Sequence, residues 1–322
     1  MNRSIFQKIL LLLILVAMFV LGGCATGINS TVQPGTIAEG YLTKLASLVP
    51  RTAGTETEVV AGSWIQATLE DLGYTVTREP FDYNVGGVKH PSANIIAVKA
   101  GKTKKTVILG AHYDSIDAGD GVDDNASGIA VLLQAANLLK DAETPQTIQF
   151  IFFGAEEPGL FGSAYHVSQM TPESIANTVL MMNYDSLVAG DNAHVYGDGD
   201  ANGKFRDRAL EIAIEKGNIL TTQPGANSHY PAGTTGDWSD HVAFKKAGIP
   251  YVYFESTNWA LGAKDGYTQV SLTFGVNGEI WHTKFDTMDY IKKNFPGRIE
   301  ERLKTFSSVT EGLLVEDLSK LK

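Results

Sequence analysis

The chain has 322 residues, of which 43% are apolar and 19% charged, and its 26 basic and 36 acidic side chains give a formal net charge of −10. This globular composition excludes a wholly disordered, collagen-like or disulfide-rich chain. The acidic balance leaves no basic surplus to meet phosphates, which argues against nucleic acid as a partner. A mean hydropathy of −0.05 excludes a multi-span membrane protein.

The first residues predict an export signal and a lipid anchor. Two basic residues precede an unbroken apolar run over 9–21, which is shorter than the roughly 20 residues of a spanning helix. The run leads into Leu-Gly-Gly-Cys24, which resembles a bacterial lipobox. We therefore expect a signal peptide over 1–23, and a lipidated Cys24 with a short tether over 24–35. The protein would then be exported and held on the extracytoplasmic side of a bacterial membrane by its acyl chains. An ordinary signal peptide or an uncleaved anchor is the alternative.

Beyond the tether, helical and strand-like patterns alternate. The predicted helices cover 36–49, 57–72, 127–140, 159–169, 202–216, 239–247 and 297–314. The predicted strands cover 74–83, 92–99, 106–113, 147–154, 178–184 and 250–255. Such alternation predicts one α/β domain over 36–322, with a mixed, mostly parallel central sheet and helices on both faces. Loops are expected at 190–203, 222–239 and 256–281, and the last is long enough to form part of a site.

Acidic and histidine residues gather where the predicted strands end, which is where ligands bind in open α/β sheets. His112 and Asp114 lie two residues apart at one such end. In extended chain their side chains point to the same face, as suits a metal-binding imidazole oriented by a carboxylate. Taken alone, the pair equally fits a core histidine beside a surface aspartate.

Two acidic pairs follow along the chain. Asp123 and Asp124 precede the long helix of 127–140. They fit either helix capping, or one carboxylate that packs while the other bridges two cations. Glu156 and Glu157 directly follow an apolar strand. Neighbouring side chains there point in different directions, so one glutamate can ligate a metal while the other acts as a base. Two solvated loop glutamates are the simpler alternative.

Asp185 and His282 complete the set. Asp185 ends an apolar strand, where a buried carboxylate needs a partner. His282 follows the long loop, and Asp286 stands four residues later as a possible orienting partner. Two histidines, two aspartates and a glutamate suit zinc or a similar divalent ion. Two metals that share a carboxylate are a known arrangement for activating water.

In this order the motifs resemble those of the two-zinc aminopeptidase family, which includes bacterial leucyl aminopeptidases, aminopeptidase S and aminopeptidase Y. The matching motifs are His-x-Asp, Gly-x-Asp-Asp-Asn-x-Ser-Gly, Glu-Glu, Asp and His-Thr, and they lie within 93–289. The resemblance implies a phosphorylase/hydrolase-like α/β fold and two Zn²⁺ per chain, with other divalent ions possible. It also implies hydrolysis of N-terminal residues from peptides that have a free N-terminus.

The resemblance implies a ligand role for five residues. His112 and Asp185 would bind one zinc, Glu157 and His282 would bind the other, and Asp124 would bridge both.

It further implies that Glu156 is the general base and that Asp114 orients His112. Asp240, within a Ser-Asp-His segment that also matches the family, would belong to the wall of the site. The chain departs from the family at 235–238, where some members place a tyrosine that helps the oxyanion, so this donor stays unassigned.

Alternatives on the same fold remain. The segments 253–259 and 264–267 are also similar to the alkaline phosphatase isozyme conversion aminopeptidases, which remove basic N-terminal residues. The preference at the first residue is therefore open between basic and apolar. Glutaminyl cyclases share much of the ligand set, so a transferase that cyclises N-terminal Gln is one alternative, and a non-catalytic peptide-binding lipoprotein is another. The sequence does not predict the oligomeric state.

Overall fold

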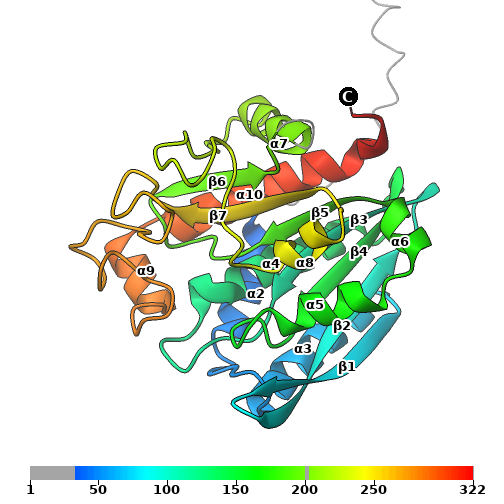
Figure 1. Cartoon of the computed structure of the whole chain (residues 1–322), viewed down its shortest axis with the longest axis horizontal. Helices are drawn as coiled ribbons and strands as arrows, with labels where there is room; N and C mark the ends of the chain where they lie inside the picture. The colour runs from blue at the N-terminus through cyan, green and yellow to red at the C-terminus, as the bar shows by residue number, and fades with distance from the viewer. Residues whose placement is uncertain (1–32, 200–202, 322) are drawn as a thin grey trace, which may run out of the picture.

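The structure is a computed structural model that describes residues 33–199 and 203–321, and the predicted signal peptide and Cys24 lie outside these residues. A single sheet of seven strands runs through the described part, in the order β1-β2-β4-β3-β5-β7-β6. Helices cover both faces of this sheet (Figure 1), which confirms the predicted α/β class. Within the described residues, no helix combines the length and the apolar character that crossing a membrane requires.

The direction of the strands decides where the site can form. The strands are β1 (Val76–Val85), β2 (Val88–Lys99), β3 (Thr103–His112), β4 (Gln146–Phe153), β5 (Thr178–Tyr184), β6 (Asn192–Gly197) and β7 (Tyr251–Thr257). The central strands β4, β3, β5 and β7 are parallel neighbours, while β1, β2 and β6 add antiparallel pairs at the two edges. The carboxyl ends of the four central strands therefore meet along one edge, and the residues that follow them converge there.

The helices form two layers of unequal size. One layer contains α2 (Thr36–Leu45), α3 (Glu56–Asp71), α4 (Ser127–Leu139), α7 (Gly203–Glu215) and α10 (Arg298–Val315). The other contains α5 (Phe161–Gln169), α6 (Pro172–Asn177) and α8 (His241–Lys246), while α9 (Met288–Asn294) packs against α10. The larger core lies under the first layer, where α4 is buried on nearly every side. A helix that is apolar all round is stable only in such a position.

The structure corrects several predicted elements. The segment 190–203, expected to be a loop, contains the edge strand β6, which is stabilised by its antiparallel ladder with β7. The short helices α6 and α9 were missed, since each consists of two turns or fewer behind a capping threonine. The first helix ends at Leu45 instead of 49, and residues 46–48 form a turn and a bend before Pro50.

Candidate metal centre

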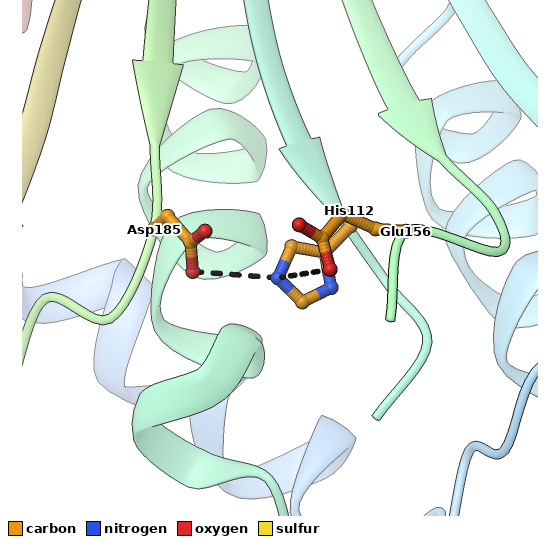
Figure 2. A group of neighbouring side chains, drawn as sticks. All are labelled: His112, Glu156 and Asp185. Carbon is orange, nitrogen blue, oxygen red and sulfur yellow. Dashed lines mark hydrogen bonds and ion pairs between the residues drawn. The ribbon is translucent and has the colours of Figure 1, made fainter. Parts of the chain in front are cut away.

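The predicted ligands converge at the carboxyl edge of the sheet. His112 is the last residue of β3, Asp185 follows the last residue of β5, and Glu156 lies three residues beyond β4 (Figure 2). Asp124 lies in the irregular turn η1 (Val122–Ala126) before α4, and His282 lies in the loop after β7. Residues up to 170 positions apart in sequence therefore share one site.

Asp124 stands between two histidines. Its Oδ1 lies 3.2 Å from His112 Nε2 and its Oδ2 lies 3.1 Å from His282 Nε2. On the first side, Asp185 Oδ1 is 3.3 Å from His112 Nε2. On the second side, Glu157 Oε2 is 3.0 Å from His282 Nε2. The two oxygens of Asp124 thus face two separate histidine–carboxylate pairs, as a bridging carboxylate requires.

The donor set fits divalent cations. The ligand atoms of His112, Glu156 and Asp185 lie within 4.8 Å of one another, and so do those of His112, Asp124 and Glu157. Glu157 Oε1 is buried and has no hydrogen-bond partner among the described residues. Imidazole nitrogens and carboxylate oxygens are ligands that zinc accepts. His112 belongs to both sets, so the distances alone do not assign each ligand to one ion.

Burial and close packing shift the acid–base equilibria of the cluster. Burial raises the pKa of Glu156 well above its usual value and that of Glu157 to about 7. Burial acts to raise the pKa of Asp124 as well, but hydrogen bonds from His112 and His282 outweigh it and lower that pKa. Hydrogen bonds to Asp124 and then to Glu157 raise the pKa of His282 to about 11. In the metal-free protein, protons bound to Glu157 and His282 therefore offset part of the negative charge that a cation is expected to offset.

We expect zinc binding to release protons and to become tighter as the pH rises. Metal ligands have to be deprotonated, whereas the raised pKa of His282 keeps its ring protonated in the metal-free protein. Glu157, with a pKa of about 7, adds a second released proton at pH values below that. Calorimetric zinc titrations in two buffers of different ionisation enthalpy measure the number released. Equal heats in both buffers would contradict this expectation, and His282→Ala should release fewer protons than the wild type.

Asp114 does more than the sequence suggested. Its Oδ1 and Oδ2 accept hydrogen bonds from the backbone N–H groups of Glu156 and Glu157, at 3.1 Å each. His112 Nδ1 lies 3.2 Å from the backbone oxygen of Asp114 and 3.6 Å from its Oδ1. This one buried carboxylate therefore fixes the backbone that carries both glutamates and borders the imidazole ring.

The structure gives Asp286 a different role from the predicted one, which was to orient His282. Its carboxylate accepts hydrogen bonds from the backbone N–H groups of Asp123, at 2.6 Å, and Asp124, at 3.1 Å. The side chains at 282 and 286 would share a face only in a helix, whereas this segment turns at His282, whose φ is 54°. Asp286 thus holds the backbone of Asp123 and Asp124, the second of which is the predicted bridging residue.

The predicted wall segment lies against Asp185. The hydroxyl of Ser239 donates to Asp185 Oδ2 over 2.6 Å and accepts from Asn183 Nδ2 over 2.7 Å. Asp240 is fully buried, and burial raises its pKa to about 7. Its charge also contributes to the raised pKa of Glu156. Asp240 therefore belongs to the electrostatic surroundings of the proposed base.

Two buried charged residues escaped the sequence analysis. Arg51 is fully buried and donates to the backbone oxygens of Tyr113 and Gly121, at 2.8 Å each, so it fixes the loop before Asp124. Glu58 is buried in α3 and accepts from the N–H of Ala155 over 3.2 Å, directly before the glutamate pair. No spacing rule links either residue to the motifs, since each reaches them only through the tertiary fold.

Three aromatic rings contact one another beside the metal cluster, between the segment that carries Ser239 and the segment that carries His282. Trp238 directly precedes Ser239, and Trp281 directly precedes His282. The ring of Tyr267 lies between them, 5.9 Å from Trp238 and 5.8 Å from Trp281 between centroids, and 53% of Tyr267 is exposed. We call these three residues the aromatic wall.

Glu255 and Asp237, the acidic residues that could recognise a basic substrate side chain, are both engaged by other side chains. Glu255 is fully buried and accepts hydrogen bonds from the hydroxyls of Tyr196, at 2.8 Å, and Tyr253, at 3.1 Å. Asp237 forms an ion pair of 2.6 Å with Lys245.

Comparison with known proteins connects this site to a family. The sequence profile of peptidase family M28 matches residues 94–307. The alkaline phosphatase isozyme conversion protein of Escherichia coli K12 is 33% identical, over 89% of this chain and 92% of the relative. Aminopeptidase YwaD of Bacillus subtilis is 31% identical over 72% of this chain, but that match spans only 46% of YwaD.

Two solved structures show the same fold. BSAP, a zinc aminopeptidase from Bacillus subtilis, superposes with a TM-score of 0.72 at 18% identity, over 91% of this chain and 98% of BSAP. A glutaminyl cyclase of Bacteroides thetaiotaomicron superposes with a TM-score of 0.69 at 20% identity, over 90% of this chain and 100% of the cyclase. The fold is therefore common to a hydrolase and a transferase and does not by itself separate these activities.

Proposed function

The chain belongs to peptidase family M28, and from that premise we propose that it is a zinc-dependent aminopeptidase that removes N-terminal residues from peptides. The observation that carries the proposal is Asp124, whose two oxygens each lie within 3.2 Å of a different histidine. This geometry favours two zinc ions, one held by His112 and Asp185 and the other by Glu157 and His282. Relatives at 30% identity or more that carry the name aminopeptidase support the reaction class.

Glu156 is the proposed general base. When bound, the zinc ions supply an acidified water and a Lewis acid for the scissile carbonyl. Glu156 Oε2 lies 4.0 Å from His112 Nε2, beside the ligands but farther away than the other carboxylates. From there the carboxylate accepts the proton of the attacking water and donates it to the leaving amine. Asp114 accepts a hydrogen bond from the backbone N–H of Glu156 and so fixes the backbone from which this side chain extends.

A panel of aminoacyl amides tests the proposal. Release of the fluorogenic amine should be lost on treatment with a chelator and should return when zinc is added. The same panel should include a peptide with N-terminal Gln, because cyclisation to pyroglutamate without release of an amino acid is the signature of the cyclase alternative. If two zinc ions are bound but no amide is cleaved, the aminopeptidase proposal is wrong.

The aromatic wall is proposed to contact the first side chain of the substrate. Its rings adjoin residues on both sides of the metal cluster, at Ser239 and His282. Large aliphatic side chains gain apolar contact there, and cationic ones can lie over the ring faces. We expect Leu and Arg amides to be cleaved with a kcat/KM at least about tenfold above that of the Ala amide, since about 1.4 kcal/mol of ring contact suffices.

The variant Tyr267→Ala checks this expectation, because Tyr267 is the exposed central ring. It should reduce the advantage of large side chains while leaving cleavage of the Ala amide within about twofold, as loss of a binding contact predicts. An equal loss for all amides would assign the ring a structural role instead.

We also propose that the protein is an exported lipoprotein, anchored through Cys24. The support is the lipobox-like sequence after a short apolar run, together with a body of acidic composition that gains nothing from anionic lipids. Metabolic labelling with a fatty acid should mark the wild type and not Cys24→Ala. Labelling of both would contradict the anchor, and the catalytic proposal is independent of this outcome.

A further inference from the structure

The first aspartate of the Asp-Asp pair joins two segments of the site. Asp123 is fully buried beside Asp124, the proposed bridging ligand. Its Oδ1 accepts hydrogen bonds from the backbone N–H groups of Val188, at 2.6 Å, and Ala189, at 2.8 Å. These amides follow Asp185 by three and four residues. One oxygen of Asp123 therefore ties the bridging segment to the segment that carries Asp185.

The other oxygen of Asp123 reaches the third segment through a glutamine. Gln269 is fully buried, and its Nε2 donates to Asp123 Oδ2 over 2.6 Å. Its Oε1 accepts from the backbone N–H groups of Ile280 and Trp281, at 2.8 Å each. Trp281 directly precedes His282. The side-chain amide of Gln269 thus connects the bridging segment to the segment that carries His282.

We propose that Asp123 and Gln269 are positioning residues, which hold the three ligand-bearing segments in register and thereby set the affinity for zinc. We call the two side chains the Asp–Gln clamp. The proposal rests on the two-zinc function proposed above. Ligands on three separate segments reach a common geometry only if those segments are fixed relative to one another, and groups behind the ligands commonly provide this.

The chemistry of the contacts explains why an amide stands at 269. A carboxylate at 123 only accepts hydrogen bonds, whereas the backbone N–H groups of 280 and 281 only donate them. A side chain between them must donate on one side and accept on the other, and the amide of Gln269 does both in a single orientation. With a carboxylate at 123, a side chain at 269 that cannot both donate and accept leaves buried polar groups without partners, which is costly in a dry interior.

Two single substitutions break the clamp without changing its size. Gln269→Glu places a second carboxylate 2.6 Å from Asp123 Oδ2, where the donor used to be. Asp123→Asn keeps an oxygen for the amides of 188 and 189 but turns an NH₂ group toward the NH₂ group of Gln269. We expect each variant to bind zinc at least about tenfold more weakly than the wild type, the usual cost of losing a group behind a ligand.

The exchange of the two groups should restore binding. In the double variant Asp123→Asn/Gln269→Glu, the amide at 123 donates to the carboxylate at 269, which still accepts from Ile280 and Trp281. Its oxygen still accepts from Val188 and Ala189, and the total charge equals that of the wild type. We expect the zinc affinity of the double variant to be within about threefold of the wild type. The interaction energy between the two substitutions would then offset the losses of binding free energy in the two single variants.

The measurements are zinc titration of the metal-free full chain by calorimetry and hydrogen exchange of the 280–282 backbone amides. The single variants should lose zinc affinity and amide protection, and the double variant should regain both. Gln134→Leu is the matched control, because Gln134 is also buried and accepts from a backbone amide, that of Ala38, at 3.0 Å. This control should leave zinc affinity unchanged.

Three outcomes would overturn the clamp: single variants that bind zinc like the wild type, a double variant no better than the singles, or an equal loss in Gln134→Leu. A wild-type chain that binds fewer than two zinc ions would instead contradict the proposed function, and the clamp with it. The wild-type titration therefore separates failure of the function from failure of the clamp.

Discussion

Glu156→Gln should lower kcat by about 10²–10⁴-fold while both zinc ions remain bound, which is the usual contribution of a general base. Gln preserves the size of the side chain and the backbone N–H that Asp114 holds at 3.1 Å. It removes only the capacity to take and return a proton. KM should change little, because the base interacts with the substrate mainly in the transition state. Steady-state kinetics together with a zinc count measure both quantities.

The neighbouring glutamate provides the matched comparison. Glu157 Oε2 lies 3.0 Å from His282 Nε2, whereas the oxygen of Glu156 nearest to His112 Nε2 is 4.0 Å from it. Glu157→Gln should therefore lose zinc, and its activity should recover partly when zinc is supplied in excess. If Glu156→Gln loses the metal while Glu157→Gln keeps it, the roles of the two glutamates are exchanged.

The sequence marked the proposed ligands, and Asp114 and Asp240 beside them, but not Arg51 or Gln269, and the reason is physical. His112, Asp124 and Asp185 lie at the ends of apolar strands or at the start of an apolar helix, so local patterns mark both the residue and its position. The parallel strands then bring these ends together.

Arg51 and Gln269 carry no such local mark. Arg51 reaches the backbone of Gly121, 70 residues away, and Gln269 reaches Asp123, 146 residues away. Their partners are chosen by the tertiary fold, which a single sequence does not reveal. The same reason explains the error at Asp286, because spacing of four residues implies a shared face only where the backbone is helical.

The edge strand β6 shows the same limit for the fold. Its six residues, Asn192–Gly197, pair with β7 in an antiparallel ladder. Glycines and aspartates nevertheless surround the strand in sequence. Those neighbours indicate a loop, and only the presence of β7 alongside makes the strand. By contrast, α4 and the second half of β3, from Val107 to His112, were predicted closely, because nearly all of these residues are buried in the core.

Asp124→Ala should abolish binding of at least one zinc ion and lower kcat/KM by at least about a thousandfold, since Lewis-acid stabilisation is worth several kcal/mol. The loss should exceed that from either histidine alone, because the two oxygens of Asp124 lie 3.2 Å and 3.1 Å from His112 and His282. A ligand that serves one ion affects that ion first, whereas a bridging ligand affects both. Zinc content after gel filtration and the kinetics of amide cleavage measure the two effects.

Glu79→Gln is the control for this experiment. Glu79 also forms a carboxylate–histidine pair, 3.1 Å from His166 Nδ1, and His166 is buried. That pair lies between β1 and α5, where Glu79 also accepts a hydrogen bond from Asn94 Nδ2 over 2.8 Å, and its hydrogen bonds do not involve a proposed zinc ligand. Loss of a carboxylate–histidine contact as such should therefore leave zinc content and activity intact. If Asp124→Ala keeps two zinc ions, as Glu79→Gln is expected to, then Asp124 does not bridge, and the five ligands have to be divided between the ions differently.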